Sequence, residues 1–329
     1  MVFIDKILFL KEFSFLYFNY KKGKKACFKV LNPSFNLFPN ALSEAEKKKI
    51  FDTYGILIPN VLGKAFAQLT GQKLTDNEFK ILCYLAALTP IIDDYFDNPL
   101  LDKNIPKERF QQLEVDEKAD DREKLMMHLY RKMIALAHDK ETQKLYIAKV
   151  IEAQELSLKQ LNKNIIPDDL IKIAYRKGGY SLLLCRSALN THIAEGEPEA
   201  IYHLGGFIQL LNDLMDVYKD REDGVYTIVT KSTDISSLKQ FLNNEWNHVI
   251  HNFYGIGYKT KNTKKFLFKV AMLVAIAKIM IEQLENLQSR TDGVFKVNDY
   301  SRKELVCDMD NFKNVWKSFR LALKEVEKL

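Results

Sequence analysis

Two groups of oxygen-bearing side chains in this sequence have the spacing of metal ligands. The first is Asp93-Asp94-Tyr95-Phe96-Asp97. Side chains three or four positions apart lie on the same side of a helix, so the three carboxylates would gather near a helix C-terminus. The helix dipole makes that end negative, and a cation is then the natural partner of the cluster. Carboxylate oxygens favour a hard divalent ion such as Mg²⁺.

The second group lies in the segment QLLNDLMDVYKD, residues 209–220. Asn212, Asp216 and Asp220 recur at every fourth position, and at about 100° per residue they drift by only about 40° per step. They therefore form one narrow stripe of oxygen ligands, with Gln209 one turn earlier. For each cluster the alternative is an ordinary solvated acidic surface. Because both follow strongly apolar stretches, we predict two metal-binding walls at the rim of an apolar cavity between helices.

Basic residues near these clusters could neutralise an anionic ligand. The candidates, in chain order, are Arg176, Lys177, Lys219 and Arg221. For the last two, a solvated charge at a helix end is the ordinary alternative. Arg176 and Lys177 directly precede Gly178-Gly179, and each glycine inside a helix costs about 1 kcal/mol relative to alanine. We expect this glycine pair to interrupt a helix.

Helices are predicted to position all of these residues. Only 13 Gly and 8 Pro punctuate 329 residues, which favours long helices over many short strands. Thr75 and Glu78 have the spacing of a capping box at a helix start. The expected helices cover residues 43–70, 75–97, 119–138, 141–163, 167–192, 197–221, 234–253, 262–289 and 301–327. Residues 1–40 are expected to be irregular, because Pro33 and Pro39 break a long helix, and residues 98–118 to be a polar loop. No repeat or linker divides the chain, so we predict a single domain over residues 1–329.

Composition excludes several other classes of protein. The four cysteines are widely spaced, which favours a reducing compartment, and we predict a cytoplasmic protein. The net charge is +6, without the blocks of Lys and Arg among exposed aromatics that mark nucleic-acid binding. The aromatic segment 1–25 either touches a membrane surface or packs on the helical body. The apolar stretch 266–281 is interrupted by lysines and is interpreted as a buried helix.

In motif order and spacing, residues 75–230 resemble the class I isoprenoid synthase superfamily, which includes terpene cyclases, trans-prenyltransferases and squalene/phytoene synthases. Residues 93–97 resemble the first Asp-rich motif, DDxxD, and residues 212–220 the second metal motif. The resemblance implies an all-α, single-domain helical bundle around a central apolar cavity. It implies three Mg²⁺ ions, and the metal ligands it implies are Asp93, Asp94, Asp97, Asn212, Asp216 and Asp220.

The resemblance further implies an activity: ionisation of a linear prenyl diphosphate, farnesyl, geranylgeranyl or longer, with release of diphosphate. The implied catalytic residues are Asp93, Arg176 and Lys219. The residues implied to bind the diphosphate are Arg176, Lys177, Gly178, Gly179, Lys219, Arg221, Tyr226 and Arg302. The prenyl diphosphate is the expected partner, and a homodimer is left open.

The branch of the superfamily is less clearly marked. Asn212, Asp213, Lys219 and Asp220 match the terpene-cyclase pattern, but Asp216 stands where Ser or Thr is usual. The squalene/phytoene pattern QxxNxxxDxxxD is met in full, without that group's tyrosine-rich signature. The basic residues typical of chain-elongating prenyltransferases are missing. We favour a bacterial-type class I terpene cyclase. From a different class, a non-catalytic partner subunit stays open, although such subunits typically lose one acidic motif and both are intact here.

Overall fold

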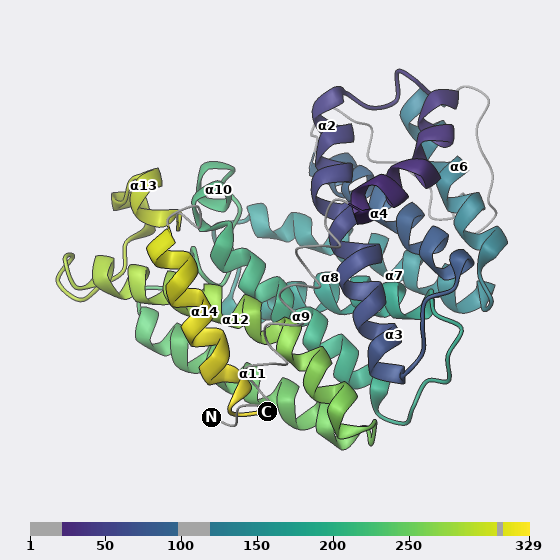
Figure 1. The fold of residues 1–329 in the computed structure, drawn as a ribbon. Coiled ribbons are helices and arrows are strands. Elements are labelled where there is room, and N and C mark those ends of the chain that lie inside the picture. The colour runs from purple at the N-terminus through teal and green to yellow at the C-terminus, as the bar shows by residue number, and fades with distance from the viewer. Residues whose placement is uncertain (1–21, 98–118, 308–311) are drawn as a thin grey trace. The chain divides into compact units, whose positions relative to one another are not determined.

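The computed structural model describes residues 22–97, 119–307 and 312–329 (Figure 1). Within these residues there are helices and no β-strand, so the prediction of an all-α fold is confirmed. The longer helices, with their bounds, are α4 (Asp76–Asp97), α6 (Asp121–Leu136), α7 (Lys140–Ser157), α8 (Pro167–Ser187), α9 (Glu197–Met215), α11 (Ile235–Gly255), α12 (Thr260–Gln288) and α14 (Phe312–Val326). The shorter ones are α2 (Glu44–Lys49), α3 (Lys64–Thr70), α10 (Val217–Glu222) and α13 (Arg302–Leu305).

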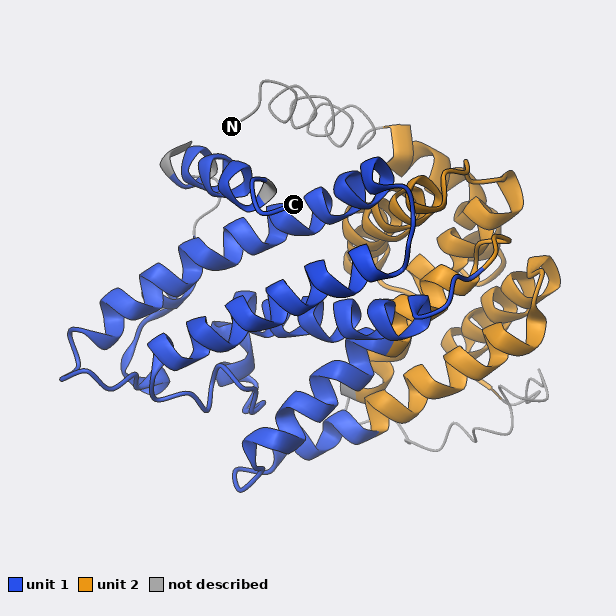
Figure 2. Ribbon diagram, turned by 90° about the horizontal axis from the view of Figure 1, so that it is seen from below, with its two compact units in different colours: residues 1–10, 156–179, 193–329 blue, residues 11–155, 180–192 orange. Residues whose placement is uncertain are grey.

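The described chain divides into two compact units (Figure 2). Unit 1 contains Leu156–Gly179 and Ile193–Leu329, whereas unit 2 contains Tyr180–His192 and the described residues before Leu156. The acidic cluster at residues 93–97 lies in unit 2, and the stripe at residues 212–220 lies in unit 1. Each is therefore described within its own unit. The single-domain organisation and the central cavity stay predictions.

Helix α12 is the central element of unit 1. It packs against α9, α11, α13 and α14. Aromatic pairs fill the layer around it: the ring centroids of Phe207 and Trp246 are 6.0 Å apart, and those of Phe253 and Phe266 are 4.9 Å apart. The stretch 266–281 lies inside α12 and is largely buried, as predicted. No helix in the described part of the chain is both long enough and apolar enough to cross a membrane.

Helix α4 is the central element of unit 2, where it packs against α6 and two π-helical turns, Ile50–Tyr54 and Leu57–Gly63. The predicted capping box is present at its start. The backbone N–H of Thr75 donates to Glu78 Oε2 at 2.7 Å, and the N–H of Glu78 donates to Thr75 Oγ1 at 3.3 Å. Glu78 Oε1 also accepts the backbone N–H of Asn190 at 2.6 Å. This carboxylate therefore fixes both the start of α4 and a distant segment of unit 2.

The N-terminal region differs from the expectation. Residues 22–37 form a helix that passes through Pro33, so the prediction of an irregular segment is wrong for this part. Cys27, Leu31 and Phe35 lie four positions apart and are at most 5 % exposed. Burial of this apolar stripe outweighs the cost of one proline in a helix, about 3 kcal/mol. Residues 1–21, and the predicted loop at 98–118, lie outside the described residues.

Residues 43–70 are helical for most of their length, as predicted. The element is divided, however, into α2, the two π-helical turns and α3. Pro59 lies in the second of these turns, where the wider turn accommodates the missing backbone N–H donor.

Candidate metal and diphosphate site

The second acidic motif lies at a break between two helices. We expected one helix over residues 197–221, but α9 ends at Met215 and α10 begins at Val217. Asp216 occupies the junction with φ −95° and ψ 9°. The chain keeps its direction, because the N–H of Asp216 bonds to the carbonyl of Asn212 at 2.9 Å and the N–H of Asp220 bonds to that of Asp216 at 2.8 Å.

The predicted stripe survives this break. Asn212 Nδ2 donates to Asp216 Oδ2 at 3.1 Å, so these two proposed ligands lie side by side. Asn212 is exposed, whereas Asp216 and Asp220 are half-buried. The motif thus has one amide at its solvent-exposed end and two carboxylates further inside. These oxygen donors suit Mg²⁺.

Negative charge is crowded at the inner end of the stripe. Burial and the neighbouring carboxylates of Asp213 and Asp216 raise the pKa of Asp220 to about 8. Burial likewise raises the pKa of Asp213 to about 6, although the Gln209 amide and the Lys177 ammonium oppose the rise. Carboxylates that repel one another and resist ionisation are favourable sites for a divalent cation.

Asp213 is the residue that sequence reasoning left out of the ligand set. It is 6 % exposed and accepts a hydrogen bond from Gln209 Nε2 at 2.8 Å. Gln209 was interpreted from the sequence as part of the metal motif. In the structure its side-chain amide is hydrogen-bonded to Asp213. The sequence spacing could have predicted this hydrogen bond, because Gln209 and Asp213 are four positions apart on α9.

Helix α8 brings a positive charge to this cluster. The Lys177 ammonium opposes the rise in the pKa of both Asp213 and Asp220, which places it in the field of the carboxylates. Lys177 and Arg176 are half-buried and make no hydrogen bond or ion pair within the described parts of the chain. Lys219, the third predicted donor, is exposed and also lowers the pKa of Asp220. These side chains are thus available to an anionic ligand.

The glycine pair does not interrupt α8, and that expectation was wrong. The helix runs unbroken from Pro167 to Ser187. A Cβ atom added to Gly178 would lie 1.9 Å from the carbonyl oxygen of Gly205 on α9, and one added to Gly179 would lie 2.4 Å from the Tyr202 ring. The backbones of α8 and α9 touch at this crossing. This contact explains why both positions are glycine, and no bound ligand is needed to account for them.

The remaining predicted substrate-binding residues have protein partners. Arg221 donates to the carbonyl oxygen of Val297 at 3.1 Å and pairs with Glu222 at 2.7 Å. The guanidinium carbons of Arg221 and Arg302 lie 4.8 and 5.8 Å from the ring centroid of Tyr218. Both arginines thereby hold the segment after α12 near α10, and their role in substrate binding stays a prediction.

Tyr226 lies against the start of α8. Its backbone N–H donates to the carbonyl oxygen of Gln160 at 2.8 Å, and Gln160 Nε2 donates back to the Tyr226 carbonyl at 3.1 Å. The Tyr226 side chain packs on the buried cluster of Ile165, Leu170 and Ile173. These contacts account for the residue structurally, and its substrate role also stays a prediction.

The first acidic motif ends α4 in unit 2. Asp93 accepts a hydrogen bond from Gln154 of α7. Asp94 pairs with Lys49 at 3.1 Å and lies 3.8 Å from Arg122. Asp97 is the last residue of α4, and its side chain lies outside the description. Asp94 therefore has two cationic partners from distant helices, which no local sequence pattern predicts.

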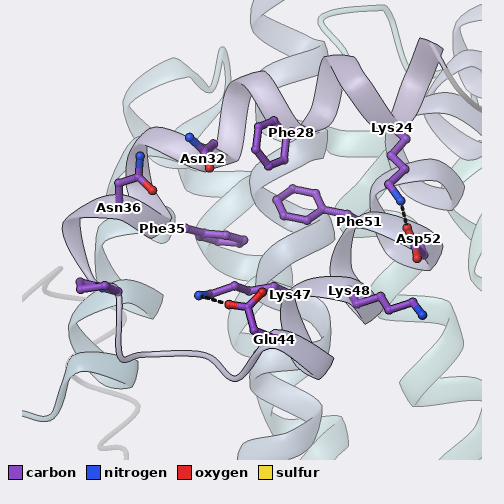
Figure 3. A pocket seen from close by; sticks show the side chains of 11 residues that line it. Lys24, Phe28, Asn32, Phe35, Asn36, Glu44, Lys47, Lys48, Phe51 and Asp52 are labelled. Carbon is purple, nitrogen blue, oxygen red and sulfur yellow. Dashed lines mark hydrogen bonds and ion pairs between the residues drawn. The ribbon is translucent and has the colours of Figure 1, made fainter.

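A cavity of about 450 Å³ lies elsewhere in unit 2 (Figure 3). The rings of Phe28, Phe35 and Phe51 form its apolar side. Its polar side carries Lys47, paired with Glu44 at 2.9 Å. None of the predicted catalytic, metal-binding or substrate-binding residues lines this cavity.

Similarity to known proteins was found only among solved structures. No family model matches the sequence, and no curated protein matches it. A geranyltransferase structure from Legionella pneumophila is 17% identical, with a TM-score of 0.46, over 76% of this chain and 96% of that one. A UbiA homolog from Archaeoglobus fulgidus, solved with GPP and Mg²⁺, is 12% identical, with a TM-score of 0.32, over 92% of this chain and 100% of that one.

Proposed function

We propose that this protein is a Mg²⁺-dependent enzyme that ionises a prenyl diphosphate and releases diphosphate, in the manner of a class I terpene cyclase. The observation that carries the proposal is the α9–α10 motif. There, an amide and crowded carboxylates lie in the field of a lysine from α8. That arrangement suits a ligand that combines divalent cations with a strongly anionic group, which describes a metal diphosphate.

The donor set fits magnesium in its chemistry. Asn212, Asp216 and Asp220 offer only oxygen ligands. The raised pKa of Asp220 reflects its burial and the neighbouring negative charge, which a divalent ion would offset. Asp93, Asp94 and Asp97 offer a second oxygen set at the end of α4. When bound, Mg²⁺ would neutralise the charge that develops on the departing diphosphate.

The basic residues of α8 are assigned to the diphosphate itself. Arg176 and Lys177 are half-buried and lack ion-pair partners within the described residues, so their donors can turn to phosphate oxygens. Lys219 approaches the cluster from α10. The glycine contact between α8 and α9 keeps Lys177 at a fixed place relative to Asp213. The carbocation left by ionisation would need an apolar, water-poor cavity, which stays a prediction.

The deciding experiment is incubation of the purified chain with C10 to C25 prenyl diphosphates and Mg²⁺, with diphosphate release and products followed by mass spectrometry. We expect release that requires Mg²⁺ and a hydrocarbon or alcohol formed from one substrate. If no chain length yields diphosphate from protein shown to be folded, the chain is not an enzyme of this type. A non-catalytic subunit would then be the better interpretation.

Four variants test the metal assignment. Asp93→Asn on α4 and Asn212→Ala on α9 should each abolish release. Their controls are Asp76→Asn, an exposed acid at the start of α4, and Asp223→Asn, an exposed acid just after α10. We expect full activity in both controls. Equal losses in a variant and its control would contradict the assignment of that motif.

The product separates the branches of the superfamily. A longer diphosphate formed when isopentenyl diphosphate is added would indicate chain elongation. A C30 or C40 hydrocarbon coupled from two substrates would indicate head-to-head condensation. Either result would overturn the terpene-cyclase assignment while leaving prenyl diphosphate chemistry in place.

A further inference from the structure

A second group of metal-binding side chains lies in unit 1, on helices α9 and α11, which pack against each other. His203 Nε2 lies 2.8 Å from Glu245 Oε2, and His248 Nδ1 lies 4.0 Å from Glu245 Oε1. One ligand atom from each of the three residues lies within 4.8 Å of the others. Glu245 and His248 are one helical turn apart on α11, so they face the same way.

We propose that His203, Glu245 and His248 bind a zinc ion that clamps α9 to α11. Two imidazole nitrogens and one carboxylate oxygen form a common zinc ligand set, with a fourth position left to water. Bonds of about 2.0–2.1 Å in a tetrahedron place ligand atoms about 3.3 Å apart. The separations in this cluster bracket that value, so small side-chain rotations would complete the site.

Neighbouring groups can orient the ligands as a zinc site requires. Asn252 Nδ2 lies 3.2 Å from His203 Nδ1. Rotating the Asn252 amide by 180° would turn its oxygen toward the ring, where it would accept the Nδ1–H and leave the Nε2 lone pair for the metal. The Tyr175 hydroxyl, from α8, donates to Glu245. The His203 and Glu245 side chains are only 20 % and 13 % exposed, whereas His248 is 64 % exposed and gives the ion a way in.

A hydrogen-bonded His203–Glu245 pair is the simpler alternative, but it leaves His248 without a reason for its place. The His248 ring sits edge-on to the His203 ring, with centroids 5.9 Å apart, although its side chain could extend freely into solvent. The cluster is also separate from the acidic stripe. His203 precedes Asn212 by nine residues, or roughly 14 Å along α9.

Zinc binding can be measured directly on the full chain. Zn²⁺ is titrated against a chromophoric chelator in buffer with excess Mg²⁺, which occupies the oxygen-only motifs. We expect one Zn²⁺ per chain in the wild type and an affinity roughly a hundred-fold lower in His248→Ala and Glu245→Gln. The matched control is His251→Ala, an exposed histidine one turn further along α11. It should bind as the wild type does.

Co²⁺ gives a second measurement with a different signal. Bound to these ligands, it should show the visible absorption of a four- or five-coordinate site in the wild type and in His251→Ala, but not in His248→Ala. His248 is exposed, so its loss should leave the fold in EDTA unchanged, as far-UV circular dichroism would show. Equal Zn²⁺ affinity in the wild type and His248→Ala would overturn the proposal, and so would an equal loss in His251→Ala. Neither assay uses enzymatic turnover, so the zinc site and the proposed activity succeed or fail separately.

Discussion

Removing the Asp220 charge provides the sharpest test of the crowded motif. Burial and the carboxylates of Asp213 and Asp216 raise the pKa of Asp220 to about 8 in the folded chain. An unfolded chain has an aspartate pKa of about 4. We therefore predict that Asp220→Asn, which keeps the side-chain size and removes the charge, stabilises the metal-free protein at high pH.

The direction follows from which state binds the proton more tightly. The folded pKa is the higher one, so between about pH 4 and pH 8 the folded chain holds more protons than the unfolded chain. The free energy of unfolding of the wild type must then fall as pH rises through this window, by at most about 1.4 kcal/mol per pH unit for this one group. Because Asp213 and Asp216 share the titration, we expect a total of roughly 2–3 kcal/mol.

The assay is urea denaturation in EDTA from pH 5 to pH 9, followed by fluorescence and circular dichroism. The difference in stability between the wild type and Asp220→Asn should be smallest at pH 5, where folded Asp220 is neutral, and should widen as pH rises. Asp223→Asn, an exposed acid three residues further on, should track the wild type throughout. Adding Mg²⁺ with inorganic diphosphate should stabilise the wild type more than the variant, and more so at higher pH, because the ligand must be ionised.

Parallel curves for the wild type and Asp220→Asn across the whole range would refute this reasoning. They would mean that Asp220 ionises as it does in water, and that the motif is a solvated acidic surface. A divergence that appears equally in Asp223→Asn would assign the effect to net charge rather than to the cluster.

Four further substitutions test the packing of these helices, each by urea denaturation. Gly178→Ala should destabilise by about 3 kcal/mol or more, because its Cβ would lie 1.9 Å from the Gly205 carbonyl oxygen. Gly255→Ala, with nothing within 4 Å, should instead stabilise by about 0.5 kcal/mol, and similar effects at both sites would contradict the close contact. Glu325→Ala should cost about 3 kcal/mol, because this 3 % exposed carboxylate pairs with Lys278 and accepts the Trp246 N–H. Glu78→Ala should cost about 2 kcal/mol through loss of the α4 cap and of the bond to Asn190, and a neutral result would contradict both roles.

Periodicity and end signals predicted much of the fold. The Thr75–Glu78 capping box, the helical class and the buried stretch 266–281 all follow from local patterns, and the structure confirms them. The helix at 22–37 departs from the expectation based on Pro33, because the apolar stripe around that proline is buried. Tertiary burial decides such cases, and a proline rule applied locally cannot include it.

Site residues were predictable only as far as they lie on one helix. Asn212 and Asp216 were expected to lie together, and they do. The Lys49 and Arg122 partners of Asp94, and the Glu245 partner of His203, come from distant helices. No spacing rule reaches across such separations. The glycine pair was detected but misinterpreted, because a glycine needed for close helix contact and one that breaks a helix look alike in sequence.

The backbone contact between α8 and α9 has a consequence for how this chain can change in length. Gly178 and Gly179 meet α9 because each has a particular angular position on α8, about 100° from the other. Deleting or inserting a single residue between Pro167 and Gly178 would rotate them by about 100° and drive a side chain into the Gly205 backbone. Length changes here can survive only when they amount to nearly whole turns of the helix. A single substitution in this segment affects only its own contacts, whereas a single insertion or deletion rotates every later residue of α8 relative to α9.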